Sequence, residues 1–153
     1  MLRTTQSQVF SDNKMTEYIT HSASETEQIA AQFAQQLKPN DIIAFRGSMG
    51  MGKTAFTRGL VSGLGLDNTV SSPTFALVNE YDTPKMIVYH FDMYRITSWN
   101  DLYSTGFFDY LDTGALMIIE WSENIEGALP DNTIYIDIAK GENEDDRIIK
   151  IER

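Results

Sequence analysis

Residues 47–54 read Gly-Ser-Met-Gly-Met-Gly-Lys-Thr, a complete G-x-x-x-x-G-K-[ST] phosphate-binding loop. Average residue frequencies put a chance match in a chain of this length at roughly half a percent. In such a loop, successive backbone N–H groups surround phosphate oxygens, and glycine permits the necessary curl. The lysine brings positive charge to the β- and γ-phosphates, and the threonine hydroxyl ligates Mg²⁺. The motif predicts a site for a nucleoside triphosphate and Mg²⁺ made by Gly47, Ser48, Met49, Gly50, Met51, Gly52, Lys53, Thr54 and Ala55.

The sequence on both sides of this loop has the pattern that phosphate binding needs. Residues 41–46 form a nearly continuous apolar run, which is typical of a strand buried on both faces. Residues 53–64 carry apolar side chains at helical spacing. The predicted helix begins at Lys53, so its positive N-terminal end would face the phosphates.

The rest of the chain predicts one α/β domain over residues 15–153. Residues 24–27 (Ser-Glu-Thr-Glu) match a capping box and begin a predicted helix over 24–37. Further strands are predicted over 16–20, 75–81, 85–91, 116–119, 133–139 and 147–151. This order indicates a P-loop NTPase-like three-layer α/β fold with a mixed sheet, mostly parallel at its centre, and a C-terminal β-hairpin. Residues 1–14 are polar and aperiodic, and we expect a flexible N-terminal extension there.

Composition limits the classes of function. The chain has 153 residues, a length typical of one domain, and 12 Lys and Arg against 22 Asp and Glu give a net charge of −10. This balance disfavours a protein that grips DNA, RNA or an anionic membrane with its whole surface. The absence of cysteine excludes disulfides and thiolate zinc sites. The sequence has no signal-peptide pattern and no apolar run of membrane-spanning length, so we expect a soluble cytoplasmic protein.

Two carboxylates follow predicted buried strands and are candidates for binding the metal and the attacking water. Residues 116–119 lead directly into Glu120, and residues 86–91 lead into Asp92. An acid at such a strand end can reach Mg²⁺ directly or through water. We assign Glu120 to the metal, together with Thr54, and Asp92 to the γ-phosphate side, where it would position or deprotonate water. The reverse assignment remains open, and so does a simple role for either acid as a cap of its strand end.

Weaker candidates lie near these acids. Residues 71–74 (Ser-Ser-Pro-Thr) carry hydroxyls that can sense a γ-phosphate, although an ordinary turn explains the same residues. Trp121 can contact the nucleotide, although a core indole is the usual default. His90 lies within a predicted strand, where a structural role is more common than a catalytic one. The internal candidates for neutralising developing phosphate charge are Arg46, Arg58 and Arg95.

Two other classes of phosphate-loop protein fit less well. A guanine-specific GTPase carries N-K-x-D and D-x-x-G segments, but residues 13–16 (Asn-Lys-Met-Thr) fail at the last position and no D-x-x-G occurs. A small-molecule kinase needs an acceptor site and usually an arginine-bearing lid, and no lid segment is evident in the sequence. A stand-alone small-molecule P-loop kinase remains the alternative function.

Several segments are similar to those of the TsaE family of bacterial P-loop ATPases. Besides the loop, these are residues 56–60 (Phe-Thr-Arg-Gly-Leu), 70–75 (Val-Ser-Ser-Pro-Thr-Phe), 77–81 (Leu-Val-Asn-Glu-Tyr), 90–95 (His-Phe-Asp-Met-Tyr-Arg) and 119–123 (Ile-Glu-Trp-Ser-Glu). With their surroundings they span about residues 20–140 in the family's order. The later segments are far more specific than the phosphate loop alone.

The resemblance implies an ATP-binding and ATP-hydrolysing protein required for threonylcarbamoyladenosine modification of tRNA. It implies ATP and Mg²⁺ as cofactors, TsaD and TsaB as partners, and contact with tRNA only through that complex; neither DNA nor a membrane is implied. We also expect slow hydrolysis without the partners, because none of the three candidate arginines sits in a motif that guarantees approach to the γ-phosphate. Ser48 stands where family loops commonly carry an acid, and Met51 stands where they carry a smaller residue, but neither departure removes a phosphate ligand. The family's functional positions fall on Lys53, Thr54, Thr74, Asp92, Glu120 and Trp121.

Overall fold

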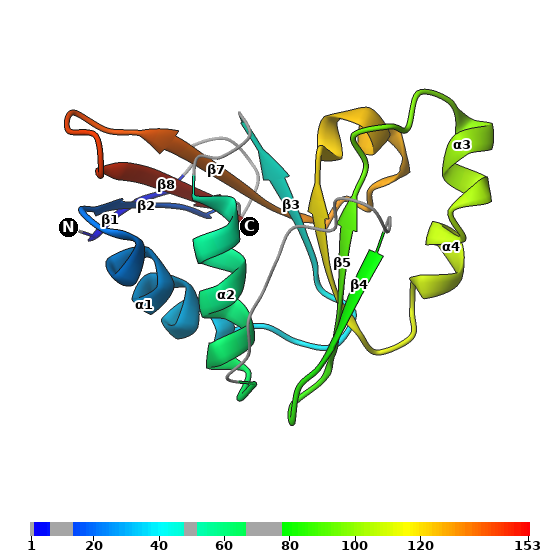
Figure 1. Cartoon of the computed structure of the whole chain (residues 1–153), viewed down its shortest axis with the longest axis horizontal. Coiled ribbons are helices and arrows are strands. Elements are labelled where there is room, and N and C mark those ends of the chain that lie inside the picture. The colour runs from blue at the N-terminus through cyan, green and yellow to red at the C-terminus, as the bar shows by residue number, and fades with distance from the viewer. Residues whose placement is uncertain (1, 7–13, 48–51, 67–77) are drawn as a thin grey trace.

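The computed structural model describes residues 2–6, 14–47, 52–66 and 78–153. They form a sheet of eight strands in the order β1-β2-β8-β7-β3-β6-β5-β4, with helices on both faces (Figure 1). The strands are β1 (Leu2–Gln6), β2 (Lys14–Thr20), β3 (Ile42–Arg46), β4 (Val78–Asp82), β5 (Ile87–Asp92), β6 (Leu116–Glu120), β7 (Ile134–Lys140) and β8 (Arg147–Glu152). The helices are α1 (Ala23–Ala34), α2 (Lys53–Gly63), α3 (Trp99–Ser104), α4 (Phe107–Tyr110) and the 3-10 helix η1 (Ser122–Ala128). Within these described ranges, no helix has both the length and the apolar character needed to cross a membrane.

The centre of the sheet is parallel. β3 pairs in parallel with β6 and β7, and β5 pairs in parallel with β6. Antiparallel strands flank this centre, with β4 beside β5 at one edge and β8, β2 and β1 beyond β7 at the other. β7 and β8 form the predicted C-terminal hairpin. The predicted mixed α/β sheet is confirmed, and the carboxyl ends of β3, β5 and β6 meet at one edge because these strands run in the same direction.

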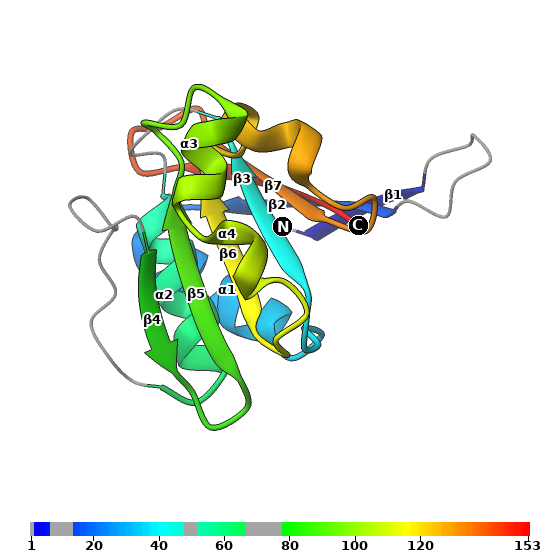
Figure 2. The same ribbon diagram turned by 90° about the vertical axis from the view of Figure 1, so that its right-hand side faces the viewer.

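Alternation along the central strands divides the core between the two faces of the sheet. In β3, Ile43 packs in the cluster that contains α1 and α2, whereas Ile42 packs in the cluster that contains α3, α4 and η1. Ile118 and Ile119 of β6 divide in the same way. Figures 1 and 2 show α1 and α2 on one side of the sheet and α3 and α4 on the other. The fold has the three predicted layers, and burial on both faces explains the apolar runs of β3 and β6.

Helix α1 begins one residue earlier than predicted, and its cap is different. Ser22 is the N-cap, since its Oγ accepts a hydrogen bond from the N–H of Glu25 at 3.1 Å, and the Glu25 carboxylate accepts one from the N–H of His21 at 3.1 Å. Two serines precede a glutamate by three residues, so the capping pattern alone does not choose between Ser22 and Ser24. The structure uses the first pair, and Glu27 instead forms an ion pair with α2.

Helices α1 and α2 pack with almost no space between their backbones. A Cβ at Gly59 of α2 would lie 2.3 Å from the carbonyl oxygen of Glu27, and a Cβ at Gly63 would lie 2.6 Å from that of Ala31. No side chain larger than hydrogen fits at either position unless a helix moves. This contact holds α2, and therefore Lys53 at its N-terminus, in a fixed place against α1.

The N-terminal segment differs from the flexible extension expected over residues 1–14. Leu2–Gln6 forms β1 and pairs antiparallel with β2, which begins at Lys14. An edge strand needs only backbone hydrogen bonds to its neighbour, so an aperiodic polar sequence does not exclude it. Residues 7–13, and residues 75–77 of the strand predicted over 75–81, lie outside the described residues.

Candidate functional site

The N-terminus of α2 is suited to an anion. Gly52 precedes the helix with a left-handed backbone (φ 97°), and among the described residues no side chain caps α2 or places a carboxylate in its first turn. By contrast, Ser22 caps α1 and Ser98 caps α3, and each of those helices has an acid in its first turn. The first N–H groups of α2 therefore suit a phosphate rather than a carboxylate of the same chain.

Lys53, the first residue of α2, carries a buried positive charge. The residue is only 3% exposed, and Nζ donates a hydrogen bond to the Gly47 carbonyl oxygen at 2.9 Å. The ion pairs formed within the described ranges do not include Lys53. A buried ammonium without a counter-charge is costly, and an ammonium has three donors, of which the Gly47 carbonyl takes one. This arrangement favours a bound oxyanion at Lys53.

The two described ends of the glycine-rich loop have the backbone that only glycine adopts readily. Gly47 has φ 95° and Gly52 has φ 97°. Both lie against β7, because a Cβ at Gly47 would be 3.5 Å from the Ile138 carbonyl oxygen and a Cβ at Gly52 would be 3.4 Å from the Ile138 side chain. Thr54 and Ala55 follow Lys53 in the first turn of α2 and are partly exposed. The remaining predicted loop residues, Ser48, Met49, Gly50 and Met51, lie outside the described residues.

Asp92 and Glu120 are brought together at the same edge of the sheet as Gly47. They end β5 and β6 and are register partners across this parallel pair. The N–H of Met93 donates to the Glu120 carbonyl oxygen at 3.0 Å, which continues the pairing one residue further. Glu120 alternates with Ile119, so its side chain lies on the face of the sheet that carries α2. The predicted neighbourhood of the two acids and the phosphate loop is what this topology produces.

The two acids differ in their surroundings. Oδ1 of Asp92 accepts a hydrogen bond from the N–H of Tyr94 at 2.9 Å, so one of its oxygens caps the strand end, as the structural alternative for this residue expects. Glu120 is 7% exposed, and its Oε2 lies 2.6 Å from Nε2 of His90, which is 1% exposed. The assignment of Glu120 to metal and of Asp92 to water remains a prediction.

His90 lies beside the two acids, although its position within a predicted strand favoured a structural role. It precedes Asp92 by two positions on β5, and period-two alternation places both side chains on the same face of the sheet. Its partner Glu120 lies on the adjacent strand at the position that pairs with Asp92. The sequence alone does not predict that His90 lies beside Glu120, because this proximity depends on β5 and β6 being neighbouring strands.

Trp121 follows Glu120 with a left-handed backbone (φ 58°) and is the N-cap residue immediately before η1. Its ring centroid lies 5.9 Å from Nζ of Lys53 and 4.9 Å from the ring of Tyr94. The next residue, Ser122, donates a hydrogen bond from Oγ to the Phe45 carbonyl oxygen at 2.8 Å and ties this turn to β3. Trp121 is partly exposed beside the Lys53 charge and also packs against the core cluster that contains α3, α4 and η1.

The three arginines considered for charge neutralisation lie in different surroundings. Arg58 pairs with Glu27 at 2.6 Å, and Arg46 lies 3.7 Å from Glu126 and from Glu152. Arg95 is exposed. A fourth arginine lies close to the loop, because Cγ and Nε of Arg147 are 3.8 Å from the place of a Cβ at Gly52. The predicted hydroxyl segment over 71–74, including Thr74, lies outside the described residues.

The donor set fits Mg²⁺ held together with a nucleotide rather than a metal caged by protein alone. Among the described residues, no three His, Asp or Glu side chains gather as a metal site. Mg²⁺ usually takes one or two carboxylates, water and substrate phosphates. Glu120 and the Thr54 hydroxyl are ligands of this kind.

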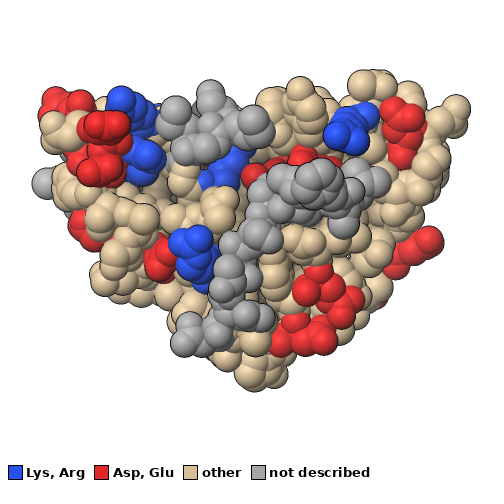
Figure 3. Space-filling model, viewed as in Figure 1, with Lys and Arg blue, Asp and Glu red and all other residues tan. Residues whose placement is uncertain are grey.

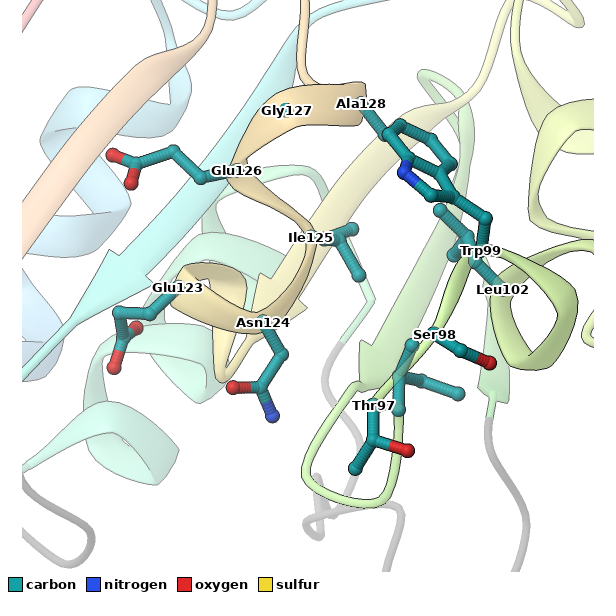
Figure 4. Close-up of a pocket in the computed structure, with 11 residues that line it drawn as sticks. Thr97, Ser98, Trp99, Leu102, Glu123, Asn124, Ile125, Glu126, Gly127 and Ala128 are labelled. Atoms are coloured by element: carbon teal, nitrogen blue, oxygen red, sulfur yellow. The ribbon is translucent and has the colours of Figure 1, made fainter.

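A separate cavity of about 280 Å³ lies between α3 and η1 (Figure 4). Trp99, Glu123, Asn124 and Glu126 are among the residues that line it. The predicted site residues are not among its lining residues. The residues that line the cavity come soon after Asp92 and Glu120 in the sequence. The cavity lies on the face of the sheet opposite to α2.

Comparisons with known proteins agree with the geometry. The family described as "Threonylcarbamoyl adenosine biosynthesis protein TsaE" matches residues 20–149. The "tRNA threonylcarbamoyladenosine biosynthesis protein TsaE" of Rickettsia prowazekii (strain Madrid E) is 44% identical over 119 residues, which cover 77% of this chain and 82% of that protein. The protein of the same name from Bacillus subtilis (strain 168) is 34% identical over 136 residues, which cover 89% of this chain and 84% of the relative. The crystal structure of Bacillus subtilis YdiB matches with a TM-score of 0.73 and 31% identity, over 92% of this chain and 86% of that one.

Proposed function

The chain belongs to the TsaE family, and from this premise we propose that it binds ATP with Mg²⁺ and hydrolyses ATP in the formation of threonylcarbamoyladenosine in tRNA. The observation that carries the proposal is the buried ammonium of Lys53 at the N-terminus of α2, without a carboxylate partner among the described residues. A triphosphate would neutralise this charge. The Rickettsia and Bacillus relatives are named for the same tRNA modification.

Each described residue of the site has a role in phosphate binding or in hydrolysis. The N–H groups that begin α2 and the Lys53 ammonium would bind phosphate oxygens and stabilise the charge that develops on them. Asp92 would position or deprotonate the attacking water through the oxygen that does not cap its strand. Thr54 and Glu120 would hold Mg²⁺, which when bound neutralises phosphate charge. Trp121 would cover the phosphate side of Lys53 and limit access of bulk water.

We propose TsaD and TsaB as the partners, with tRNA reached through them. The net charge of −10 supports this indirect role, because direct binding of tRNA generally requires a basic surface. On the face of the molecule in Figure 3, acidic side chains lie among and beside the basic ones, and the described residues of this face form no continuous basic patch. A protein that acts on tRNA through others needs no such patch.

Hydrolysis is expected to be slow until the partners bind. Fast hydrolysis of a triphosphate on a phosphate loop generally needs a positioned water and an arginine-like charge. Arg58 is held by Glu27, and Arg46 lies beside two glutamates. Arg147, which lies near Gly52, already donates hydrogen bonds to the carbonyl oxygens of Glu144 and Asp146. A partner that supplies the missing charge would couple hydrolysis to assembly.

The experiment is steady-state phosphate release from ATP with Mg²⁺, with and without purified TsaD and TsaB, beside a screen of small phosphoacceptors. Slow release that rises with the partners supports the proposal. Rapid release that the partners leave unchanged would reject the coupling. Transfer to a small acceptor would establish the kinase alternative instead.

A further inference from the structure

His90 and Glu120 form a buried polar pair at the candidate site. Packing of the apolar core does not require such a pair. Nε2 of His90 lies 2.6 Å from Oε2 of Glu120, and the two residues are 1% and 7% exposed. An ionised carboxylate only accepts, so Nε2 carries the hydrogen and donates it. Taking an imidazole and a carboxylate out of water costs free energy that two apolar side chains would not cost. The pair is therefore better explained by orientation of Glu120 than by stabilisation of the core.

The remaining contacts of His90 do not suggest another task. Its Nδ1 is buried and has no hydrogen-bond partner among the described residues. Its ring lies 6.4 Å from that of Tyr81 on β4, at an interplanar angle of 36°. Among the described residues, the imidazole therefore hydrogen-bonds to the acid that ends the neighbouring strand.

We propose that His90 is a positioning residue for Glu120: its Nε2–H holds Oε2, so that the carboxylate keeps one orientation toward the cation of the bound nucleotide. This inference rests on the proposed function, since it concerns the same Mg²⁺. Partners that hold metal-ligating groups typically change metal affinity or activity by roughly 10- to 100-fold when they are removed. An effect of that size is expected on the Mg²⁺ dependence of ATP binding.

The test compares two variants with opposite expectations. His90→Gln keeps an N–H donor near the place of Nε2, whereas His90→Phe keeps the aromatic shape and removes the donor. The quantity measured is the ratio of ATP dissociation constants in EDTA and in excess Mg²⁺, by titration calorimetry, with the melting temperature of each variant. His21→Gln is the matched control, because the side chain of His21 is 61% exposed.

A positioning role predicts that His90→Gln keeps most of the Mg²⁺ enhancement and that His90→Phe loses it by at least about tenfold. A purely structural role predicts the reverse order, with His90→Phe close to wild type, and would overturn the inference. If His90→Phe does not fold, His90→Asn takes its place, because its amide lies near the position of Nδ1 and does not reach Glu120.

A double-variant cycle separates action through Glu120 from any independent effect. In the Glu120→Gln background, the further change His90→Phe should leave the Mg²⁺ enhancement unchanged. An additional loss of the same size as in the wild type would refute action through Glu120. If ATP binding by the wild-type protein does not depend on Mg²⁺, the proposed metal site is overturned together with this inference. If the wild-type protein shows the dependence and both His90 variants keep it, this inference alone is overturned.

Discussion

Substituting Gly59 with alanine tests whether the close packing of α1 and α2 is as tight as the structure has it. A Cβ at this position would lie 2.3 Å from the Glu27 carbonyl oxygen and 2.7 Å from Cβ of Ala30. Ordinary contact begins near 3.4 Å, so the helices must separate by about 1 Å. Overpacking of this kind costs about 1–3 kcal/mol, and we take the upper end because backbone cannot rotate away. Alanine gains about 1 kcal/mol of helix propensity over glycine, so the net loss is about 2 kcal/mol.

Thermal unfolding followed by circular dichroism measures this loss. For a domain of this size, about 2 kcal/mol lowers the melting temperature by roughly 4–8 °C. Ser62→Ala is the matched control, because Ser62 is exposed on the same helix and gains only propensity, about 0.5 kcal/mol. A Gly59→Ala protein that melts at or above the wild-type temperature would refute the reasoning, since propensity would then outweigh packing and α2 would not be fixed by this contact.

Three further predictions concern the charged residues. Lys53→Ala should weaken binding of ATP with Mg²⁺ at least about tenfold in titration calorimetry, and unchanged affinity would reject the phosphate site. Glu120→Gln and Asp92→Asn should each lower the rate of phosphate release by roughly 10²–10⁴-fold. Only Glu120→Gln should also reduce the Mg²⁺ dependence of ATP binding. If Asp92→Asn reduces it instead, the roles assigned to the two acids are reversed. The hydrogen bond to Asp146 raises the pKa of His21 in the folded protein. The pairing therefore stabilises the fold fully at a pH below the unfolded pKa of His21. This stabilisation is lost as the pH rises through the higher folded pKa. His21→Gln should therefore lower the melting temperature more at about pH 5.5 than at about pH 9, and an equal effect at both would contradict this sign.

The strand before the glycine-rich loop and the helix after it were predictable because local pattern determines them. The apolar run before Gly47 and the helical spacing after Lys53 do not depend on any distant residue. The same holds for the C-terminal hairpin, whose two strands are neighbours in the chain. Where two local patterns competed, as with Ser22 and Ser24, the sequence alone could not choose the cap.

The parts that the sequence did not reveal depend on contacts between distant segments. The pairing of His90 with Glu120 follows from β5 lying beside β6. The residue spacing within either strand does not predict which strand is its neighbour. The packing of Gly59 against Glu27 depends on how α1 crosses α2. Leu2–Gln6 forms a strand by pairing with the edge of β2. The composition of this segment does not predict that pairing.

The central claim is that the nucleotide site of this chain serves the formation of threonylcarbamoyladenosine in tRNA. The most direct measurement is the content of that nucleoside in tRNA, by mass spectrometry, from bacterial cells depleted of their own TsaE and supplied with this chain or with its Lys53→Ala variant. The wild-type chain is predicted to restore the modified nucleoside, and the variant to leave it near the depleted level at equal protein abundance. Equal restoration by both would contradict the claim that nucleotide binding at Lys53 is required, and restoration by neither would contradict the assigned role in tRNA modification.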